Sequence, residues 1–263
     1  MKKLMFAAAA IAAGVAVADV TSANIVGYAT RETNETDLRE GNQCFAPQFV
    51  TVGENGVKLL DIGFDFSAID VITGEVKIQR LNKNGVPTDT WRYYKGQTRG
   101  SFKTAGWYNG TTRITADNQP TFAAYEGLYL GLLPGVKVTT SGEVLQQNVT
   151  VTYEETGNKI LSNPYPVGLK LLDIQLGIEA ISVITGEIKI QRLNKNGVPT
   201  DTWRYYKGQT RGSFKTEGWY NGTTRITVDN QPTFAAGEGL YFGGLEGMTV
   251  TFVAPNLTQA AAE

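Results

Sequence analysis

Apolar and polar residues alternate along a stretch of the chain that begins near residue 60. Ile62, Phe64 and Phe66 are apolar, whereas the residues between them are Gly63 and Asp65. A related stretch later in the chain keeps apolar residues at the matching positions and changes the residues between them: Ile174, Leu176 and Ile178, separated by Gln175 and Gly177. A period of two is typical of a half-buried β-strand, because a helix would keep apolar residues three and four positions apart.

The second stretch belongs to a long internal repeat. Residues 71–124 return as residues 183–236, an offset of 112, with three differences in 54 positions. The flanks are more diverged, since residues 56–70 and 168–182 are identical at 8 of 15 positions. The repeat predicts two tandem homologous domains, residues 19–146 and 147–257, followed by a frayed tail at 258–263. The near-identity of the centres is compatible with functional constraint and equally with recent gene conversion.

Turn-forming residues separate the other apolar segments. Asn82-Lys83-Asn84-Gly85 lies between segments 74–81 and 88–95, which predicts a β-hairpin. Asn109-Gly110 and Pro134-Gly135 mark two more pairs of strands, 106–109 with 111–116 and 127–133 with 136–144. Short strands with frequent turns predict an all-β fold with about eight strands per copy. The pattern does not distinguish a β-sandwich from a compact barrel.

The N-terminus has the features of a secretory signal peptide over residues 1–18. Lys2 and Lys3 precede an apolar run from Leu4 to Val17, and small residues at Ala16 and Ala18 predict cleavage before Asp19. The alternative is an uncleaved N-terminal anchor, although the run is shorter than the roughly 18 residues that a membrane-spanning helix needs. We therefore expect an exported chain with no transmembrane segment after cleavage, located in the periplasm, at the cell surface or outside the cell.

The charge balance bears on a nucleic-acid partner, and the cysteine content bears on disulfide bonds. The chain has 24 basic and 25 acidic residues, whereas a general nucleic-acid-binding protein is usually more basic. We therefore expect no nucleic-acid partner. Cys44 is the only cysteine, so it is either a small buried residue or a link between two chains. The second copy has Ile160 at the matching position, which favours burial.

Three short motifs carry a resemblance to known proteins. They are Ser22–Tyr28 (SANIVGY), the two GWYNG segments at 106–110 and 218–222, and Thr139–Val144 (TTSGEV). With them the chain resembles a group of exported β-domain proteins from the Verrucomicrobia and Lentisphaerae lineages, for which no activity is established. The second copy departs from the pattern, because it ends in TFVAPN. The resemblance implies export and implies no particular activity.

The sequence lacks the residues of most catalytic sites. It contains no histidine, which excludes Ser-His-Asp and Cys-His sites and the imidazole-containing zinc sites. No phosphate-binding loop, dinucleotide motif or calcium loop is present. A pair of carboxylates, as in glycoside hydrolysis, remains possible among the repeated acids Asp61/Asp173, Glu75/Glu187, Asp89/Asp201, Asp117/Asp229 and Glu126/Glu238. We expect no enzyme and no cofactor or metal, because turn and capping roles account for such acids equally well.

The segment from Lys77 to Lys103 is the best candidate for a binding surface, because aromatic and basic residues alternate in it. On a strand, Trp91 and Tyr93 share one face, and Arg92 and Tyr94 share the other. One face is core, and the other presents an aromatic ring beside a cation, which suits sugars or anionic polymers. The tentative ligand-binding residues are Trp91, Arg92, Tyr93, Tyr94, Trp107, Trp203, Arg204, Tyr205, Tyr206 and Trp219. The alternative is that Trp91 and Tyr93 are core residues, and that the GWYNG segments serve core packing and a turn, with one of Trp107 and Tyr108 pointing inward.

Three functional hypotheses follow. The first is an exported structural or cell-surface protein that associates with itself through its β domains. The second is a carbohydrate-binding or adhesion module that uses the repeated aromatic and basic segment on an extracellular polysaccharide. The third is a glycoside-active hydrolase.

Overall fold

The structure is a computed structural model, and it describes residues 26–32, 41–70, 72–96, 103–182, 184–194, 198–208 and 215–255. The signal peptide, its cleavage site and the predicted tail at 258–263 lie outside these residues. The prediction of an all-β fold is confirmed, because the described residues form strands, turns and two single-turn 3-10 helices, η1 (Leu59–Asp61) and η2 (Leu171–Asp173).

Residues 26–143 form three antiparallel sheets. A six-stranded sheet has the order β2-β10-β5-β6-β7-β8, a three-stranded sheet has the order β1-β11-β4, and β3 pairs with β9. The strands are β1 (Val26–Glu32), β2 (Gly41–Phe45), β3 (Gly56–Lys58), β4 (Gly63–Asp65), β5 (Thr73–Leu81), β6 (Pro87–Tyr94), β7 (Gly106–Asn109), β8 (Thr112–Arg113), β9 (Thr121–Ala123), β10 (Leu128–Leu132) and β11 (Lys137–Glu143).

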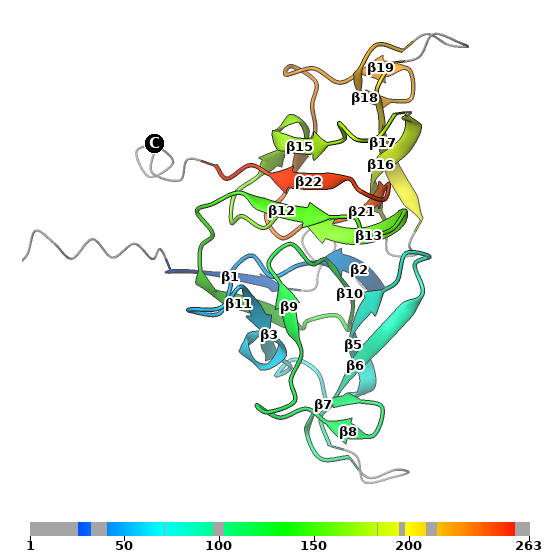
Figure 1. Cartoon of the computed structure of the whole chain (residues 1–263). Coiled ribbons are helices and arrows are strands. Elements are labelled where there is room, and N and C mark those ends of the chain that lie inside the picture. Colours follow the sequence, from blue (N-terminus) through cyan, green and yellow to red (C-terminus); the bar gives the residue numbers. More distant parts are fainter. Residues whose placement is uncertain are drawn as a thin grey trace, which may run out of the picture.

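Residues 149–252 follow the same strand order, element for element. The corresponding sheets are β13-β21-β16-β17-β18-β19, β12-β22-β15 and β14-β20. The strands are β12 (Val149–Thr152), β13 (Gly157–Ser162), β14 (Leu169–Lys170), β15 (Ile174–Gly177), β16 (Thr185–Leu193), β17 (Pro199–Tyr206), β18 (Gly218–Asn221), β19 (Thr224–Arg225), β20 (Thr233–Phe234), β21 (Gly239–Gly244) and β22 (Thr249–Phe252). The hairpins β7–β8 and β18–β19 lie at opposite ends of the molecule, and β2 and β13 lie near its middle (Figure 1).

The buried apolar residues form two clusters rather than one. One cluster is drawn from residues 45–138 and the other from residues 151–252. Ile62 and Ile174, from the alternating stretches, are each 3% exposed. Phe122 and Phe234 are completely buried at equivalent positions of the two clusters. The buried residues of the two stretches therefore belong to different clusters, one in each half of the chain.

One predicted pairing is wrong. Segments 127–133 and 136–144 were expected to form a pair around Pro134-Gly135, but β10 pairs with β2 and β5, and β11 pairs with β1 and β4. Leu130 and Val138 are both buried in the same cluster, so the chain turns at this point from one sheet to another across the core. Alternation along each strand is the same in a hairpin and in such a crossing, so sequence pattern does not separate the two.

The other turn predictions are confirmed. β5 pairs with β6 across the turn at Asn82–Gly85, and β7 pairs with β8 across Asn109-Gly110. Gly85 has φ 77° and Gly110 has φ 58°, a conformation that glycine adopts without the steric penalty of a Cβ.

Phe64 offers a test of the strand assignment. Its ring is half-buried against Trp107, with ring centroids 5.1 Å apart. We expect Phe64→Asp to lower the free energy of unfolding by about 1 to 3 kcal/mol, because a carboxylate would replace a packed ring. Thr111→Asp adds the same charge at an exposed turn position and should change little. Equal effects of the two variants in urea denaturation would contradict the assignment.

Candidate functional site

The four predicted tryptophan sites are core residues. Trp91 and Trp107 are 3% and 5% exposed, and Trp203 and Trp219 are each 4% exposed. Trp91 packs edge-on against Phe122, with ring centroids 5.4 Å apart. Their rings therefore have no free face for a sugar, and the prediction of tryptophan platforms is wrong. The core interpretation holds because the opposing sheet supplies aromatic partners that cover the rings.

Tyr93 and Tyr205 lie on the same side of their strands as the tryptophans. Tyr93 is half-buried and stacks on Phe66, with centroids 4.2 Å apart. Tyr205 donates a hydrogen bond from its hydroxyl to Glu217 at 2.7 Å, a contact that the first half lacks because Ala105 stands at the matching position. Desolvation, reinforced by Glu217, raises the pKa of Tyr205. Both tyrosines thus cover the core and are unavailable as platforms.

The remaining predicted residues, Arg92, Tyr94, Arg204 and Tyr206, lie on the opposite side of the sheet. Tyr94 packs edge-on against Tyr108 with centroids 5.5 Å apart, and the Lys103 ammonium lies 4.7 Å from the Tyr94 centroid and 4.2 Å from the Tyr108 centroid. Arg92 donates to the carbonyl of Gly74 at 3.0 Å. The second half repeats every one of these contacts at positions raised by 112.

Two equivalent surfaces can therefore be defined. The first basic face consists of Lys77, Arg92, Tyr94, Lys103 and Tyr108, and the second consists of Lys189, Arg204, Tyr206, Lys215 and Tyr220. Their tyrosines at 108 and 220 were absent from the predicted set, and only the geometry brings them to the lysines.

Each basic face holds two like charges opposite each other. Lys77 lies directly across from Arg92 in the β5–β6 register, and Lys189 lies across from Arg204. Desolvation, and then the neighbouring guanidinium, lowers the pKa of Lys77, and the same causes act on Lys189. Among the residues that the structure describes, none of these four cations forms an ion pair with a carboxylate. Like charges directly opposite on a sheet are destabilising.

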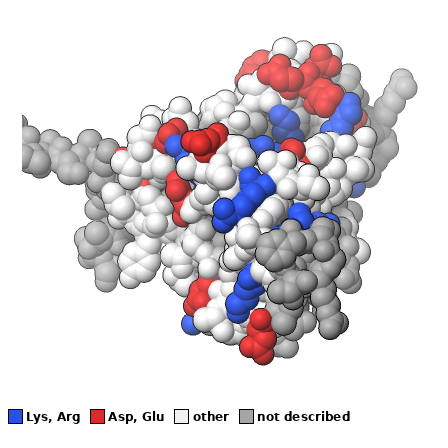
Figure 2. All heavy atoms as spheres, turned by 90° about the horizontal axis from the view of Figure 1, so that it is seen from below, with Lys and Arg blue, Asp and Glu red and all other residues white. Residues whose placement is uncertain are grey.

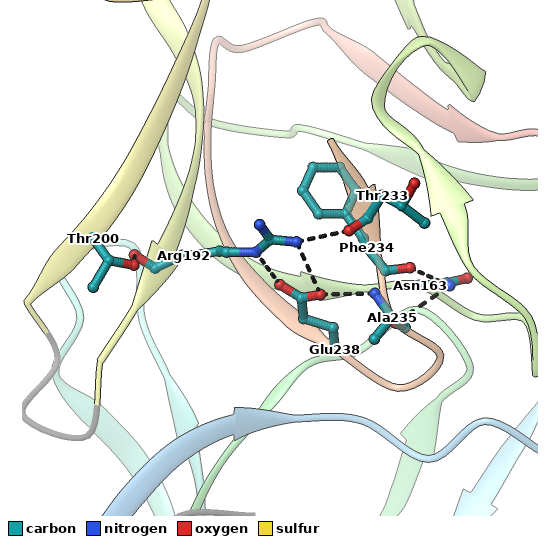
Figure 3. A network of polar contacts seen from close by, with 7 residues as sticks. All are labelled: Asn163, Arg192, Thr200, Thr233, Phe234, Ala235 and Glu238. Atoms are coloured by element: carbon teal, nitrogen blue, oxygen red, sulfur yellow. Dashed lines mark hydrogen bonds and ion pairs between the residues drawn. The ribbon is translucent and has the colours of Figure 1, made fainter. Parts of the chain in front are cut away.

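A second repeated arrangement pairs an arginine with a glutamate. Arg192 Nε donates to Glu238 Oε1 at 2.6 Å, and Arg192 Nη2 donates to the carbonyl of Thr233 at 2.7 Å (Figure 3). Glu238 Oε2 in turn accepts a hydrogen bond from the backbone N–H of Ala235 at 2.7 Å. The guanidinium lies 5.4 Å from the ring centroid of Trp203. Arg80 and Glu126 repeat the pair in the first half at 2.5 Å.

At least four of the repeated acids have structural partners. Glu126 and Glu238 are held by the arginines, and Glu75 accepts hydrogen bonds from Thr73, whose hydroxyl lowers the pKa of that carboxyl. Asp61 accepts a hydrogen bond from the hydroxyl of Thr51 at 2.7 Å. These contacts account for four of the ten repeated acids, and none of the four faces another carboxylate in them, so they give the hydrolase hypothesis no support.

The segments held by the arginine–glutamate pairs contact the other half of the chain. Glu238 forms an antiparallel bridge with Phe45, and Glu126 forms one with Leu161. Phe45 lies opposite Leu128 in its own sheet, and Leu161 lies opposite Leu240, which makes the two bridges equivalent.

We call the region around these two bridges the junction between the halves. Backbone hydrogen bonds across the junction are also equivalent in the two directions. Ala46 N donates to the carbonyl of Gly237 at 3.2 Å, and Ser162 N donates to the carbonyl of Tyr125 at 3.0 Å. Each half thus contributes one strand end (45–46 or 161–162) and one turn (125–126 or 237–238), as in an isologous dimer interface. The Lys83–Glu155 ion pair at 2.7 Å also crosses the junction, beside a pocket of about 320 Å³.

Cys44 lies at this junction. The residue is partly exposed, but burial of its side chain raises the pKa of the thiol to about 12. A Cβ at Gly239 of the second half would lie 2.7 Å from the Cys44 Cβ. The thiol therefore stays protonated at neutral pH, which agrees with a packing role.

Two other kinds of site are absent from the described residues. Within those ranges no three or more acidic or cysteine side chains gather in a metal-binding cluster, and no helix has the length and hydropathy to cross a bilayer. Comparison with protein-family models, with curated proteins and with solved structures gives no significant match.

Proposed function

We propose that the chain is an exported structural or cell-surface protein without catalytic activity, built of two tandem homologous β-sandwich domains at residues 19–146 and 147–257. The observation that carries the proposal is the reciprocal junction, in which equivalent backbone groups join the halves. The connection between them is exposed at Gln146–Asn148, yet the halves are held by strand bridges rather than by that connection alone.

The junction favours a mechanical role over a hinged one. Enzymes and ligand clamps that close over a substrate use interfaces that can open, whereas these bridges depend on backbone hydrogen bonds in fixed register. Glu126 and Glu238, the acids of the two strand bridges, are engaged by arginines and backbone N–H groups. Rigid units of this kind suit a protein that bears load or that assembles with further copies of itself.

Assembly tests the proposal directly. We expect the purified chain to form larger particles as its concentration rises, measured by light scattering, and the particles to be ordered in electron micrographs. A chain that stays a single monomer at every accessible concentration would count against the structural role. Turnover of a polysaccharide that is lost on replacing one repeated acid pair would favour the hydrolase instead.

A glycine at the junction and a glycine inside the first half provide a matched pair of variants. A Cβ at Gly239 would lie 2.7 Å from the carbonyl carbon of Cys44, whereas a Cβ at Gly63 would make only ordinary contacts of 3.4 Å or more. We expect Gly239→Ala to destabilise the chain by about 1 to 3 kcal/mol, because backbone must move across the junction. Gly63→Ala should have a much smaller effect.

The readout for this pair is the association of the halves. With a protease site placed at Gln146-Gln147, the cut halves of the unaltered chain and of the Gly63→Ala variant should elute together in size-exclusion chromatography. Those of the Gly239→Ala variant should elute apart. Separation of the unaltered halves immediately after cleavage would show that the reciprocal contacts do not hold them.

A further inference from the structure

We infer that the two basic faces bind the charged groups of an acidic polysaccharide, one face per half, and that a single chain cross-links two polymer strands. The inference does not depend on self-assembly, because the basic faces lie on strands β5–β6–β7 and β16–β17–β18, whereas the two strand bridges that join the halves are formed by Phe45 with Glu238 and by Leu161 with Glu126. It rests on the unpaired cations, on the covered tyrosine rings and on the placement of the faces.

The unpaired cations indicate an anionic ligand. Lys77 faces Arg92 and Lys189 faces Arg204, and within the described ranges of the chain neither pair has a carboxylate partner in an ion pair. Such a pair costs stability in the free protein, so a bound anion that neutralises both charges would relieve the repulsion. In the view from below, basic side chains lie across the middle of the surface, and acidic side chains gather nearer its margins (Figure 2).

The second basic face also has a hollow. A depression of about 500 Å³ lies over β17 and β18, lined among others by Thr202, Arg204, Tyr206 and Asn221, with Asp201 as its one carboxylate. Hydroxyl, amide and guanidinium groups there can donate hydrogen bonds to a sugar and its charged substituent. The volume is within the range of sites that hold small ligands.

The covered tyrosine rings argue against nucleic acid. One side of Tyr94 lies against Gly74, where a Cβ would be 3.0 Å from the ring, and the Lys103 ammonium lies over the ring at 4.7 Å from its centroid. Tyr206 is placed in the same way between Gly186 and Lys215. Proteins that bind single-stranded nucleic acid without sequence preference stack bases on open aromatic faces, which these tyrosines lack. Recognition through charge and hydrogen bonds suits sulfated or carboxylated sugars better.

The position of the faces indicates a polymer and a cross-link. The hairpins β7–β8 and β18–β19, which border the two faces, lie at opposite ends of the molecule (Figure 1). A small anion would occupy each face separately, but two polymer strands bound at opposite ends would be joined by the chain. Many such links would turn a solution of the polymer into a network.

Charge reversal at equivalent positions gives the test. In Lys77→Glu the new carboxylate would face Arg92 and neutralise it, so the variant should melt no lower than the unaltered chain. The double variant Lys77→Glu/Lys189→Glu should bind dextran sulfate at least about tenfold more weakly, which corresponds to about 1.4 kcal/mol. Lys58→Glu/Lys170→Glu makes the same change in net charge at another pair of equivalent positions, 112 residues apart, and should bind within about twofold of the unaltered chain.

Cross-linking has a separate readout. At a protein concentration at which the chain alone shows no assembly by light scattering, the unaltered chain mixed with dextran sulfate should become turbid. Under the same conditions the single variant Lys77→Glu should still bind the polymer but no longer produce turbidity. Neutral dextran should give neither signal, and polygalacturonate in place of dextran sulfate shows whether carboxylates serve as well as sulfates. The inference is overturned if both double variants lose binding equally, if no acidic polysaccharide binds at low salt, or if single-stranded DNA binds more tightly than either polysaccharide.

Discussion

Trp203→Ala is expected to lower the free energy of unfolding by about 3 to 5 kcal/mol, the usual cost of removing a large aromatic ring from a core. The ring is 4% exposed and packs edge-on against Phe234, with centroids 5.6 Å apart. It also lies beneath the guanidinium of Arg192, so its loss removes one of the two rings beside that charge and leaves only Phe234. Urea denaturation followed by circular dichroism measures the effect.

The first half contains the matched experiment. Trp91→Ala removes the equivalent ring, which packs on Phe122 and lies 5.3 Å from Arg80. If each half unfolds as a unit, each variant should shift one transition and leave the other near its original midpoint. Tyr94→Ala removes a ring from the outer side of the same sheet and should cost clearly less than Trp91→Ala. A cost below about 1 kcal/mol for both tryptophan variants would contradict their core placement.

The fold class followed from the sequence because alternation and turn chemistry are local. Ile62 and Ile174 are buried as the period of two predicts, and Asn109-Gly110 forms the predicted tight turn. The strand order was not predictable in this way. β10 and β11 share a turn but belong to different sheets, and each satisfies the same alternation by facing the common cluster.

The binding surface was predicted only in part, because both sides of β6 carry aromatic residues. Trp91 and Tyr93 alternate with Arg92 and Tyr94, so the sequence alone does not show which side of the strand faces the core. The choice depends on which rings the opposing sheet can cover, and Phe66 and Phe122 come from distant segments that pack on one side alone. The basic residues remain candidate ligand-binding residues, whereas the tryptophans are core residues.

The junction between the halves left no recognisable pattern in the sequence. Glu126 and Glu238 were visible as repeated acids, but their arginine partners lie 46 residues earlier. Gly127 and Gly239 have no special φ, and their importance comes from Ile160 and Cys44, which approach them across the junction. Such contacts depend on the relative placement of two packed halves, which local pattern does not encode.

The arginine–glutamate pair is expected to give the second large effect. Arg192→Met leaves the Glu238 carboxylate beside the core without its cation, and should cost about 2 to 4 kcal/mol. The side chains are 32% and 22% exposed, so solvent screens part of the attraction and the cost lies below that of a fully buried pair. The segment that would loosen, Ala235–Glu238, carries the contacts of the second half to Phe45 and Ala46.

A double-mutant cycle isolates the pair from the packing of its stems. Arg192→Met/Glu238→Gln should be no less stable than Arg192→Met alone, since no unpaired charge remains, and the cycle should give a coupling energy of about 1 to 3 kcal/mol. Lys83 and Glu155 form the matched control, because their side chains are 45% and 60% exposed and their ion pair also crosses the junction. The cycle with Lys83→Met and Glu155→Gln should give about 0 to 1 kcal/mol. Equal coupling in the two cycles would mean that the Arg192–Glu238 pair contributes no more than a surface ion pair and does not brace the segment that joins the halves.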